Sequence, residues 1–327
     1  MATLHVFNPD HDYALAVGIN VYVSPNKIKK IAKNLEMLPA YGANRDDYIL
    51  REDNSVVGVG SGRQTELSKI KGEIEAIRPW GWDHSLVMRL GSLGIDSQLL
   101  PSRKELIEMR RLSHRRISID LINHLKVGPV PKECFSLEEA SDFLENEKYA
   151  FFKAPWSSSG RGIVNSRRMP EENLFAWIRG IINKQGSVLA EKGAEKLQDF
   201  ASLWECRGVE AVFKGFSMTK ADDKGQYLGN ICAPQKEMYK YLSDIAVEDP
   251  KSYLEEQKEF LDNRVAGDYD GPLGIDMLID KEGKIRPCIE INLRNTMGHM
   301  AMDYMNYIET KRNGNWEPDP YSLFERL

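Results

Sequence analysis

The chain has 327 residues, of which 42% are apolar and 28% are charged, and its formal net charge is −5. This balance is typical of a folded globular protein that is long enough for two or three packed units, and it excludes a disordered chain. A nucleic-acid-binding surface needs a basic excess, which the chain as a whole lacks.

Targeting and membrane signals are not evident in the sequence. The first residues show no basic stretch before a long apolar run, and residues 3–7 instead predict a first strand. No segment approaches the roughly 18 apolar residues of a membrane helix. The four cysteines form no C-x-x-C pair and are too sparse for a disulfide scaffold: Cys134, Cys206, Cys232 and Cys288. We therefore expect a cytoplasmic protein with buried thiols.

Residues 1–110 predict an α/β unit, because short apolar strands alternate with helical patterns. In chain order we expect a strand over 3–7, a polar turn over 8–12, a strand over 55–59, a helix over 64–77 and a helix that ends near residue 90. The helix over 64–77 rests on the helical spacing of Leu67, Ile70, Ile74 and Ile77. Two distinctive segments, Asn8–Asp12 and Trp80–Asp83, are each open to two interpretations, a binding surface or a structural turn.

Residues 111–200 predict a second, smaller unit. A helical stretch that opens at Pro101 leads into this unit from the first one. Within the unit we expect a helix over 115–125, and Ser136 and Glu139 have the spacing of a capping box at another helix start. We then expect a strand over 149–153, its hairpin partner over 163–166, a helix from 170 to 186 and a strand over 187–191.

Residues 201–327 predict a third unit made mostly of strands. The expected strands cover 203–206, 209–213, 227–232, 273–279 and 285–291, and the expected helices cover about 251–261 and 299–308. The last two strands are joined by a tight turn, so we expect them to pair with each other.

Acidic residues inside these last two strands are the strongest chemical signal. Asp276 and Glu290 each lie within a strongly apolar strand, and Asn292 shares the face of Glu290 by the alternation of strand side chains. Two carboxylates and an amide on one sheet face form an oxygen-rich site that suits Mg²⁺. The alternative is structural: Asp276 would pair with a lysine or arginine, and Glu290 would cap a loop.

A second signal is a lysine at the end of the strand over 149–153, followed by a Ser/Gly-rich loop. Lys153 would present a point charge to phosphates, and small residues would let backbone amides approach them. The candidate loop residues are Ser158, Ser159, Gly160, Arg161 and Gly162. An ordinary flexible hairpin is the alternative interpretation.

A third signal lies at the end of the strand over 187–191. Its backbone, at Glu191 and onward to Ala194, could bind the edge of an adenine base. An acidic residue a few positions further on, Asp199, could accept hydrogen bonds from ribose hydroxyls. The alternative is a strand end with solvated charges.

Taken in order, these three signals resemble the ATP-grasp superfamily over about residues 110–300. The resemblance implies an α/β N-terminal domain followed by an ATP-grasp fold, in which ATP lies between two α+β subdomains. It assigns Lys153, the following loop, Glu191, Ala194 and Asp199 to ATP, and it assigns Asp276, Glu290 and Asn292 to Mg²⁺. Where the family usually has a phosphate-contacting lysine at a helix start, this chain has Arg115 or Arg116.

The activity that this resemblance implies is ligation. An ATP-grasp ligase phosphorylates a carboxylate to an acylphosphate, which an amine then attacks. Arg294 follows the metal residues directly and could meet the developing oxyanion, and the backbone amide of Gly298 could reach the same place. We expect small-molecule or peptide carboxylates and amines as partners, with no nucleic acid and no membrane, and the oligomeric state stays open. The alternatives are a kinase that phosphorylates a hydroxyl and a non-catalytic nucleotide-binding module.

Overall fold

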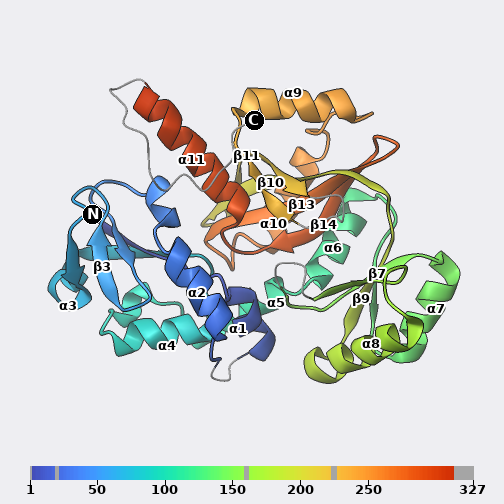
Figure 1. Ribbon diagram of the computed structural model, residues 1–327, viewed down its shortest axis with the longest axis horizontal. Coiled ribbons are helices and arrows are strands. Elements are labelled where there is room, and N and C mark those ends of the chain that lie inside the picture. The colour runs from blue at the N-terminus through green and yellow to red at the C-terminus, as the bar shows by residue number, and fades with distance from the viewer. Residues whose placement is uncertain (1, 19–21, 158–161, 222–226, 313–327) are drawn as a thin grey trace.

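The computed structural model describes residues 2–18, 22–157, 162–221 and 227–312, and it contains three separate β-sheets. In Figure 1 the N-terminal unit (blue to cyan) and the second unit (green) lie on opposite sides, and the third unit (yellow to red) lies next to both. No described helix is both long and apolar enough to cross a membrane.

The first sheet has the strand order β4-β3-β2-β1-β5, and β1 is parallel to both of its neighbours. Its strands are β1 (Ala2–Val6), β2 (Tyr48–Leu50), β3 (Ser55–Gly58), β4 (Gln64–Glu66) and β5 (Ile74–Pro79). The associated helices are α1 (His11–Val17), α2 (Asn26–Leu35), η1 (Leu38–Tyr41), α3 (Leu67–Ile70), η2 (Lys71–Glu73), α4 (His84–Ser92) and η3 (Ser97–Leu99).

The predicted helix over 64–77 is wrong. This segment contains the end strand β4, two short helical turns and β5, which pairs with β1 so that Leu4 lies opposite Ile77. The apolar spacing is compatible with a helix, but β5 gains a partner strand some 70 positions earlier in the chain, and local periodicity cannot detect such pairing.

The second sheet is antiparallel, with the order β6-β9-β7-β8. It consists of β6 (Lys132–Cys134), β7 (Ala150–Lys153), β8 (Ile163–Asn165) and β9 (Val188–Lys192) and packs against α7 (Leu137–Glu147) and α8 (Glu171–Gln185). The hydroxyl of Ser136 caps α7 by accepting from the amide of Glu139, as the capping-box spacing predicts. In a capping box the Ser136 amide would donate to the Glu139 carboxylate. Here the amide of the preceding residue, Phe135, makes that hydrogen bond instead.

The third sheet is antiparallel, with the order β12-β11-β10-β13-β14. Its strands are β10 (Lys196–Arg207), β11 (Glu210–Ala221), β12 (Tyr227–Ile231), β13 (Gly271–Asp280) and β14 (Ile285–Asn292). Both β10 and β11 are longer than predicted, because their polar ends still find ladder partners. Lys196, for example, lies opposite Asp280 of β13.

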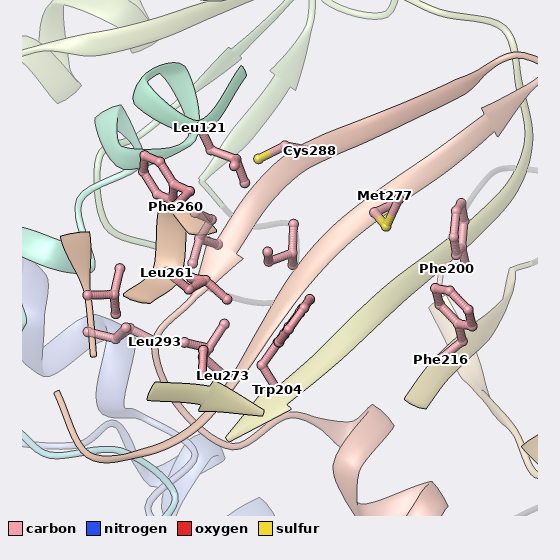
Figure 2. Packing of buried hydrophobic residues seen from close by; sticks show 14 of the residues in the cluster. Leu121, Phe200, Trp204, Phe216, Phe260, Leu261, Leu273, Met277, Cys288 and Leu293 are labelled. Atoms are coloured by element: carbon pink, nitrogen blue, oxygen red, sulfur yellow. The ribbon is translucent and has the colours of Figure 1, made fainter. Parts of the chain in front are cut away.

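Helices cover this third sheet and complete the largest core. They are α9 (Gln235–Ile245), which the sequence did not predict, α10 (Leu254–Arg264) and α6 (Arg116–Leu125). Figure 2 shows Leu121 of α6, Phe260 of α10 and Trp204 of β10 within the same cluster. The sequence places α6 in the second unit, and the apolar face of this helix packs in the core over the third sheet.

Two helices connect the units. Helix α5 (Arg103–Leu112) leads from the N-terminal unit to α6, and the amide of Ile291 in β14 donates to the Ser118 hydroxyl of α6 at 3.2 Å. The last helix, α11 (Met297–Arg312), packs with Phe7, Leu38 and Trp80 of the N-terminal unit. The first and third units therefore share a buried apolar interface, and the division at residues 110 and 200 stays a prediction.

Candidate functional site

The three predicted metal residues come together on the paired strands β13 and β14. Asp276 lies directly opposite Glu290, and Asn292 lies opposite Gly274 one step along the same face. The side-chain amide of Asn292 donates to the Asp276 carboxylate at 3.0 Å. The hairpin register thus places two carboxylates and an amide side by side.

The electrostatics of this group favour a bound cation. Burial, and next the neighbouring Glu290 carboxylate, raise the pKa of Asp276 to about 7, while the hydrogen bond from Asn292 opposes the rise. Keeping two adjacent, partly buried carboxylates ionised costs free energy, and a bound divalent cation would offset that cost. The donor set is made of carboxylate and amide oxygens, the ligands that Mg²⁺ prefers, so Asp276, Glu290 and Asn292 fit this ion. This proposed metal site contains two acidic side chains and one amide. A metal site with three or more His, Cys, Asp or Glu ligands does not occur among the described residues.

Arg115 joins this carboxylate group to the loop after β7. Its side chain is buried, Nη2 donates to Glu290 Oε1 at 2.7 Å, and Nη1 donates to Ser157 Oγ at 2.7 Å and to the carbonyl of Ala154. Its Nε is buried without a hydrogen-bond partner among the described residues. One guanidinium therefore bridges the second and third sheets.

Arg116 points elsewhere. Half of its side chain is exposed, and Nη2 donates to Glu133 Oε1 at 2.8 Å. Its Nε contacts His114 Nδ1 at 3.3 Å. Of the two arginines between which the sequence could not choose, only Arg115 reaches the carboxylate group.

Lys153 and Glu191 form a buried ion pair on the second sheet. They project from the antiparallel neighbours β7 and β9, and Lys153 Nζ contacts Glu191 Oε2 directly. From β14, Arg286 Nη1 lies 3.8 Å from Glu191 Oε1 and donates to the carbonyl of Lys192 at 2.8 Å. Arg286 is thus a second arginine that ties the two sheets together.

The other predicted nucleotide residues are less closely connected to this group. Asp199 lies on β10 in contact with Lys196, and Ala194 lies in the connection between β9 and β10. At Gly162 the carbonyl accepts from the amide of Ala154 at 2.7 Å, and any Cβ would overlap the Ser157 side chain. The remaining loop residues, Ser158, Ser159, Gly160 and Arg161, lie outside the described residues.

Arg294 is held by an acid from the N-terminal unit. Its Nε and Nη2 each lie 2.9 Å from Asp12 Oδ2, and Nη2 also donates to Asn292 Oδ1 at 2.9 Å. Nη1 donates to the carbonyl of Asn295 at 3.1 Å. The guanidinium therefore orients Asn292 and connects it to α1, and a substrate carboxylate would have to replace Asp12 to use the same fork.

The two distinctive N-terminal segments contact each other at the carboxyl ends of β1 and β5. The Asn8 side chain donates to the Gly81 carbonyl at 2.8 Å and to the Asp83 carboxylate at 3.0 Å. A Cβ at Gly81 would overlap the ring of the buried His11. The amide of Asn295 then donates to the Trp80 carbonyl at 2.7 Å. Both segments make structural contacts, and together they hold the backbone that follows Asn292. The first ends in α1, and the alternative interpretation of each as a binding surface stays a prediction.

Gly298 has a packing reason to be glycine. It lies in the first turn of α11, and a Cβ there would lie 2.8 Å from Cβ of Ser217 on β11. Its small size therefore lets α11 approach the third sheet, and a role for its amide in catalysis stays a prediction.

Residues that our sequence analysis missed fall into two kinds. Asp12 lies inside a segment that looked distinctive but had no assigned role, and Ser157 directly precedes the predicted loop. The sequence around Arg286 gave no signal of a role. Its role depends on two tertiary features, the pairing of β14 with β13 and the hydrogen bond of Arg286 to the backbone of β9.

Comparison with known proteins supports this architecture. No protein-family model and no curated protein matches the sequence, but solved structures do. The chain is similar to N5-carboxyaminoimidazole synthetase from Staphylococcus aureus complexed with ADP, with a TM-score of 0.52 and 14% identity over 97% of this chain and 79% of that one. It is similar to biotin carboxylase from Campylobacter jejuni in a β-γ-ATP complex, with a TM-score of 0.51 and 17% identity over 78% and 58% of the two chains.

A third similar structure is the biotin carboxylase domain of 2-oxoglutarate carboxylase from Hydrogenobacter thermophilus in complex with MgADP. Its TM-score is 0.50, with 19% identity over 78% of this chain and 56% of that one. The protein therefore has the ATP-grasp fold, which confirms the predicted fold class: an α/β N-terminal domain followed by two α+β subdomains.

Proposed function

We propose that this protein binds Mg-ATP between its second and third sheets and uses it to activate a carboxylate for attack by an amine. The observation that carries the proposal is the bridge made by Arg115. This buried side chain bonds both Ser157, which directly precedes the predicted phosphate loop, and Glu290, which lies opposite Asp276. A phosphate loop and an acidic metal site must adjoin in an enzyme that transfers a phosphoryl group.

Each side chain has a defined part in the proposal. Lys153 and Arg115 supply positive charge to the phosphates once they exchange their present partners, Glu191 and Glu290, for the ligand. Mg²⁺, when bound by Asp276, Glu290 and Asn292, neutralises charge on the phosphates. The end of β9 at Glu191 and the following Ala194 face the adenine, Asp199 holds the ribose, and the phosphate loop is Ser158 to Gly162.

The carboxylate substrate is proposed to lie beyond the γ-phosphate, next to Arg294. This arginine holds Asn292 in place and would stabilise the developing oxyanion on release of Asp12, with the amide of Gly298 as a second donor. The acylphosphate formed there is attacked by the amine, and the products are an amide, ADP and phosphate.

Two further parts of the proposal concern setting and partners. The four cysteines are all free and buried, which supports a reducing, cytoplasmic compartment. The substrates are small-molecule or peptide acids and amines.

A substrate screen tests the function. ADP release is measured with Mg-ATP over a panel of carboxylic acids, with and without amines, and a thermal-shift titration measures nucleotide binding. Mg-ATP at 100 times its Kd should add about 2.7 kcal/mol to the free energy of unfolding. ADP release that requires both an acid and an amine supports the ligase. ADP release with a hydroxyl acceptor and no amine would make the protein a kinase, and a folded sample with no thermal shift would contradict ATP binding.

A further inference from the structure

A cavity with a volume of about 370 Å³ lies between the N-terminal unit and the third unit. Strand β5 and the residues around η1 line one side, and the start of β13, Asn295 and α11 line the other. Small-molecule sites typically have volumes of about 300–1,000 Å³. The cavity can therefore hold a small metabolite, and among the residues that the structure describes none of those proposed above for ATP or Mg²⁺ lines it.

Asp303 of α11 carries the clearest chemical signal in this cavity. Its carboxylate lies against the backbone after η1, where a Cβ at Gly42 would come within 2.8 Å of Asp303 Cγ. Within the described parts of the chain it forms no hydrogen bond and no ion pair. Burial, and next the Glu205 carboxylate, raise the pKa of Asp303 to about 6, while the more distant charges of Arg78 and Lys214 oppose the rise without pairing with it. A carboxylate in this position is stabilised by a cation that enters the cavity.

The other charged residues of the lining do not supply that cation. The guanidinium of Arg78 is paired with Glu205 at 2.7 Å. The ring of His5 bonds Asp47 at 3.1 Å, and burial lowers the pKa of His5, so this ring is neutral at pH 7. Asp270 also lines the cavity without a cationic partner among the described residues. The lining therefore has an excess of negative charge.

Asn295 lies in the same lining, but its Oδ1 atom, which lacks a hydrogen-bond donor within the described residues, is buried and does not open onto the cavity. Its backbone is held from two sides, because its amide donates to Trp80 and its carbonyl accepts from Arg294. A protonated amine brings a positive charge and hydrogen-bond donors, both of which the two oxygens of the Asp303 carboxylate can take up.

We propose that this cavity binds a small molecule that carries a protonated amine, with Asp303 as the counter-ion. The inference stands apart from the ligase proposal, because binding requires neither ATP nor Mg²⁺. If the ligase proposal holds, the amine bound here is either the nucleophile or an effector, and the experiment distinguishes the two.

Binding is measured by thermal shift and calorimetry on the full chain, without nucleotide and at constant ionic strength. The probes are ethylamine, ethanolamine and putrescine, with ethanol and acetamide as uncharged counterparts. Asp303→Asn keeps the shape and removes the charge. Asp268→Asn is the matched control, because Asp268 is exposed and does not line the cavity. Gly42→Ala presses a methyl group against the Asp303 carboxylate and tests the same position from the other side.

We expect at least one amine to raise the melting temperature while its uncharged counterpart does not. Its Kd should rise at least tenfold in Asp303→Asn and in Gly42→Ala and stay within twofold in Asp268→Asn. Without ligand, Asp303→Asn should melt at or above the wild-type temperature, because an uncompensated charge is removed. Equal binding to wild type and Asp303→Asn, or no binding of any amine to folded wild type, would overturn the proposal.

The role of the amine follows from a second measurement with Mg-ATP and an acid substrate. Consumption of the amine in step with ADP release identifies it as the nucleophile. A change in the rate of ADP release without consumption identifies it as an effector. Either result keeps the cavity as an amine site, and failure of ADP release altogether bears on the ligase proposal alone.

Discussion

Two acidic regions flank the segment from Asn292 to Asp303. One is the carboxylate group on β13 and β14, the other is the cavity that contains Asp303, and the two differ in whether their charges are paired. On the β13–β14 side, Glu290 is paired with the buried Arg115, and Arg294 is paired with Asp12. On the cavity side, Asp303 has no partner in the described structure. In the first region a ligand must replace existing ion pairs in order to bind. In the second region a cation can bind to Asp303 without breaking an ion pair.

This difference predicts different responses to mutation. Removing one member of a buried pair leaves the other charge uncompensated, which is destabilising as well as inactivating. Removing an unpaired buried charge relieves a cost.

The largest effect is expected for Glu290→Gln. The amide keeps the shape and an acceptor for Arg115, but it removes one of the two carboxylates proposed to hold Mg²⁺. Loss of several kcal/mol of charge stabilisation corresponds to a fall in ADP release of at least about 100-fold. The assay pairs ADP release with a melting curve. Glu282→Gln, at an exposed position in the turn of the same hairpin, is the control and should keep wild-type activity. Release of ADP by Glu290→Gln at the wild-type rate would remove Glu290 from the metal site.

A smaller but still large effect is expected for Arg294→Lys. A lysine keeps the charge but cannot hold Asp12 and Asn292 together in the same geometry, so ligation should fall about 10- to 100-fold with Mg-ATP affinity nearly unchanged. Asp12→Asn and the double variant complete a cycle. If Arg294 acts mainly through its pair with Asp12, the effects on turnover will not add.

Additive effects in that cycle would mean that Arg294 meets the substrate independently of Asp12. Equal loss of ATP affinity and turnover in Arg294→Lys would place this side chain on the nucleotide and contradict the acceptor assignment.

Arg115→Lys and Arg116→Lys form a matched pair at adjacent positions. A lysine at 115 cannot bond Ser157 and Glu290 at once, so we expect the Kd of Mg-ATP to rise about tenfold, the value of one lost charge-assisted bond. The same substitution at 116 changes a half-exposed pair with Glu133 and should leave the Kd within twofold. Calorimetric titration of both variants decides between them. A larger effect at 116 would reverse the assignment.

The smallest effect is expected on the free energy of unfolding at acid pH, through His299 in the segment from Asn292 to Asp303. His299 is buried, its Nδ1 contacts Thr296 Oγ1 at 2.9 Å, and burial lowers the pKa of His299 to about 4. A histidine with a lowered folded-state pKa binds its proton more readily in the unfolded chain. Its contribution to stability is therefore present above about pH 6.5 and is lost as the pH falls towards 4.

Replacing His299 by Gln should reduce the slope of stability against pH between 6.5 and 4 by at most one proton, roughly 1.4 kcal/mol per pH unit. Denaturant melts at several pH values measure this slope. The same substitution at the partly exposed His124 serves as the control and should leave the slope unchanged. An unaltered slope in His299→Gln would show that protonation of this ring is not linked to unfolding.

Local signals served well where one strand or one cap carried the information. The alternation in β14 placed Glu290 and Asn292 on one face, and the tight turn before it predicted that Asp276 would lie opposite. The hydroxyl of Ser136 caps α7 as its spacing indicated. Local signals failed where a strand pairs with a partner far away in the sequence. Examples are β5, whose apolar spacing suggested a helix, and the polar ends of β10 and β11.

By itself, the sequence determined the group of Asp276, Glu290 and Asn292, because adjacent strands and tight turns are short-range features that a chain encodes locally. The ATP-grasp fold class followed from the resemblance of its motifs, taken in order, to that superfamily. Only the tertiary structure decided that Arg115 rather than Arg116 meets this group, that Asp12 holds Arg294, and that Asp303 faces a cavity without a partner. Each of these depends on elements far apart in the chain that pack together. Charge pairing is a property of distance in space, which the order of residues along the chain does not state.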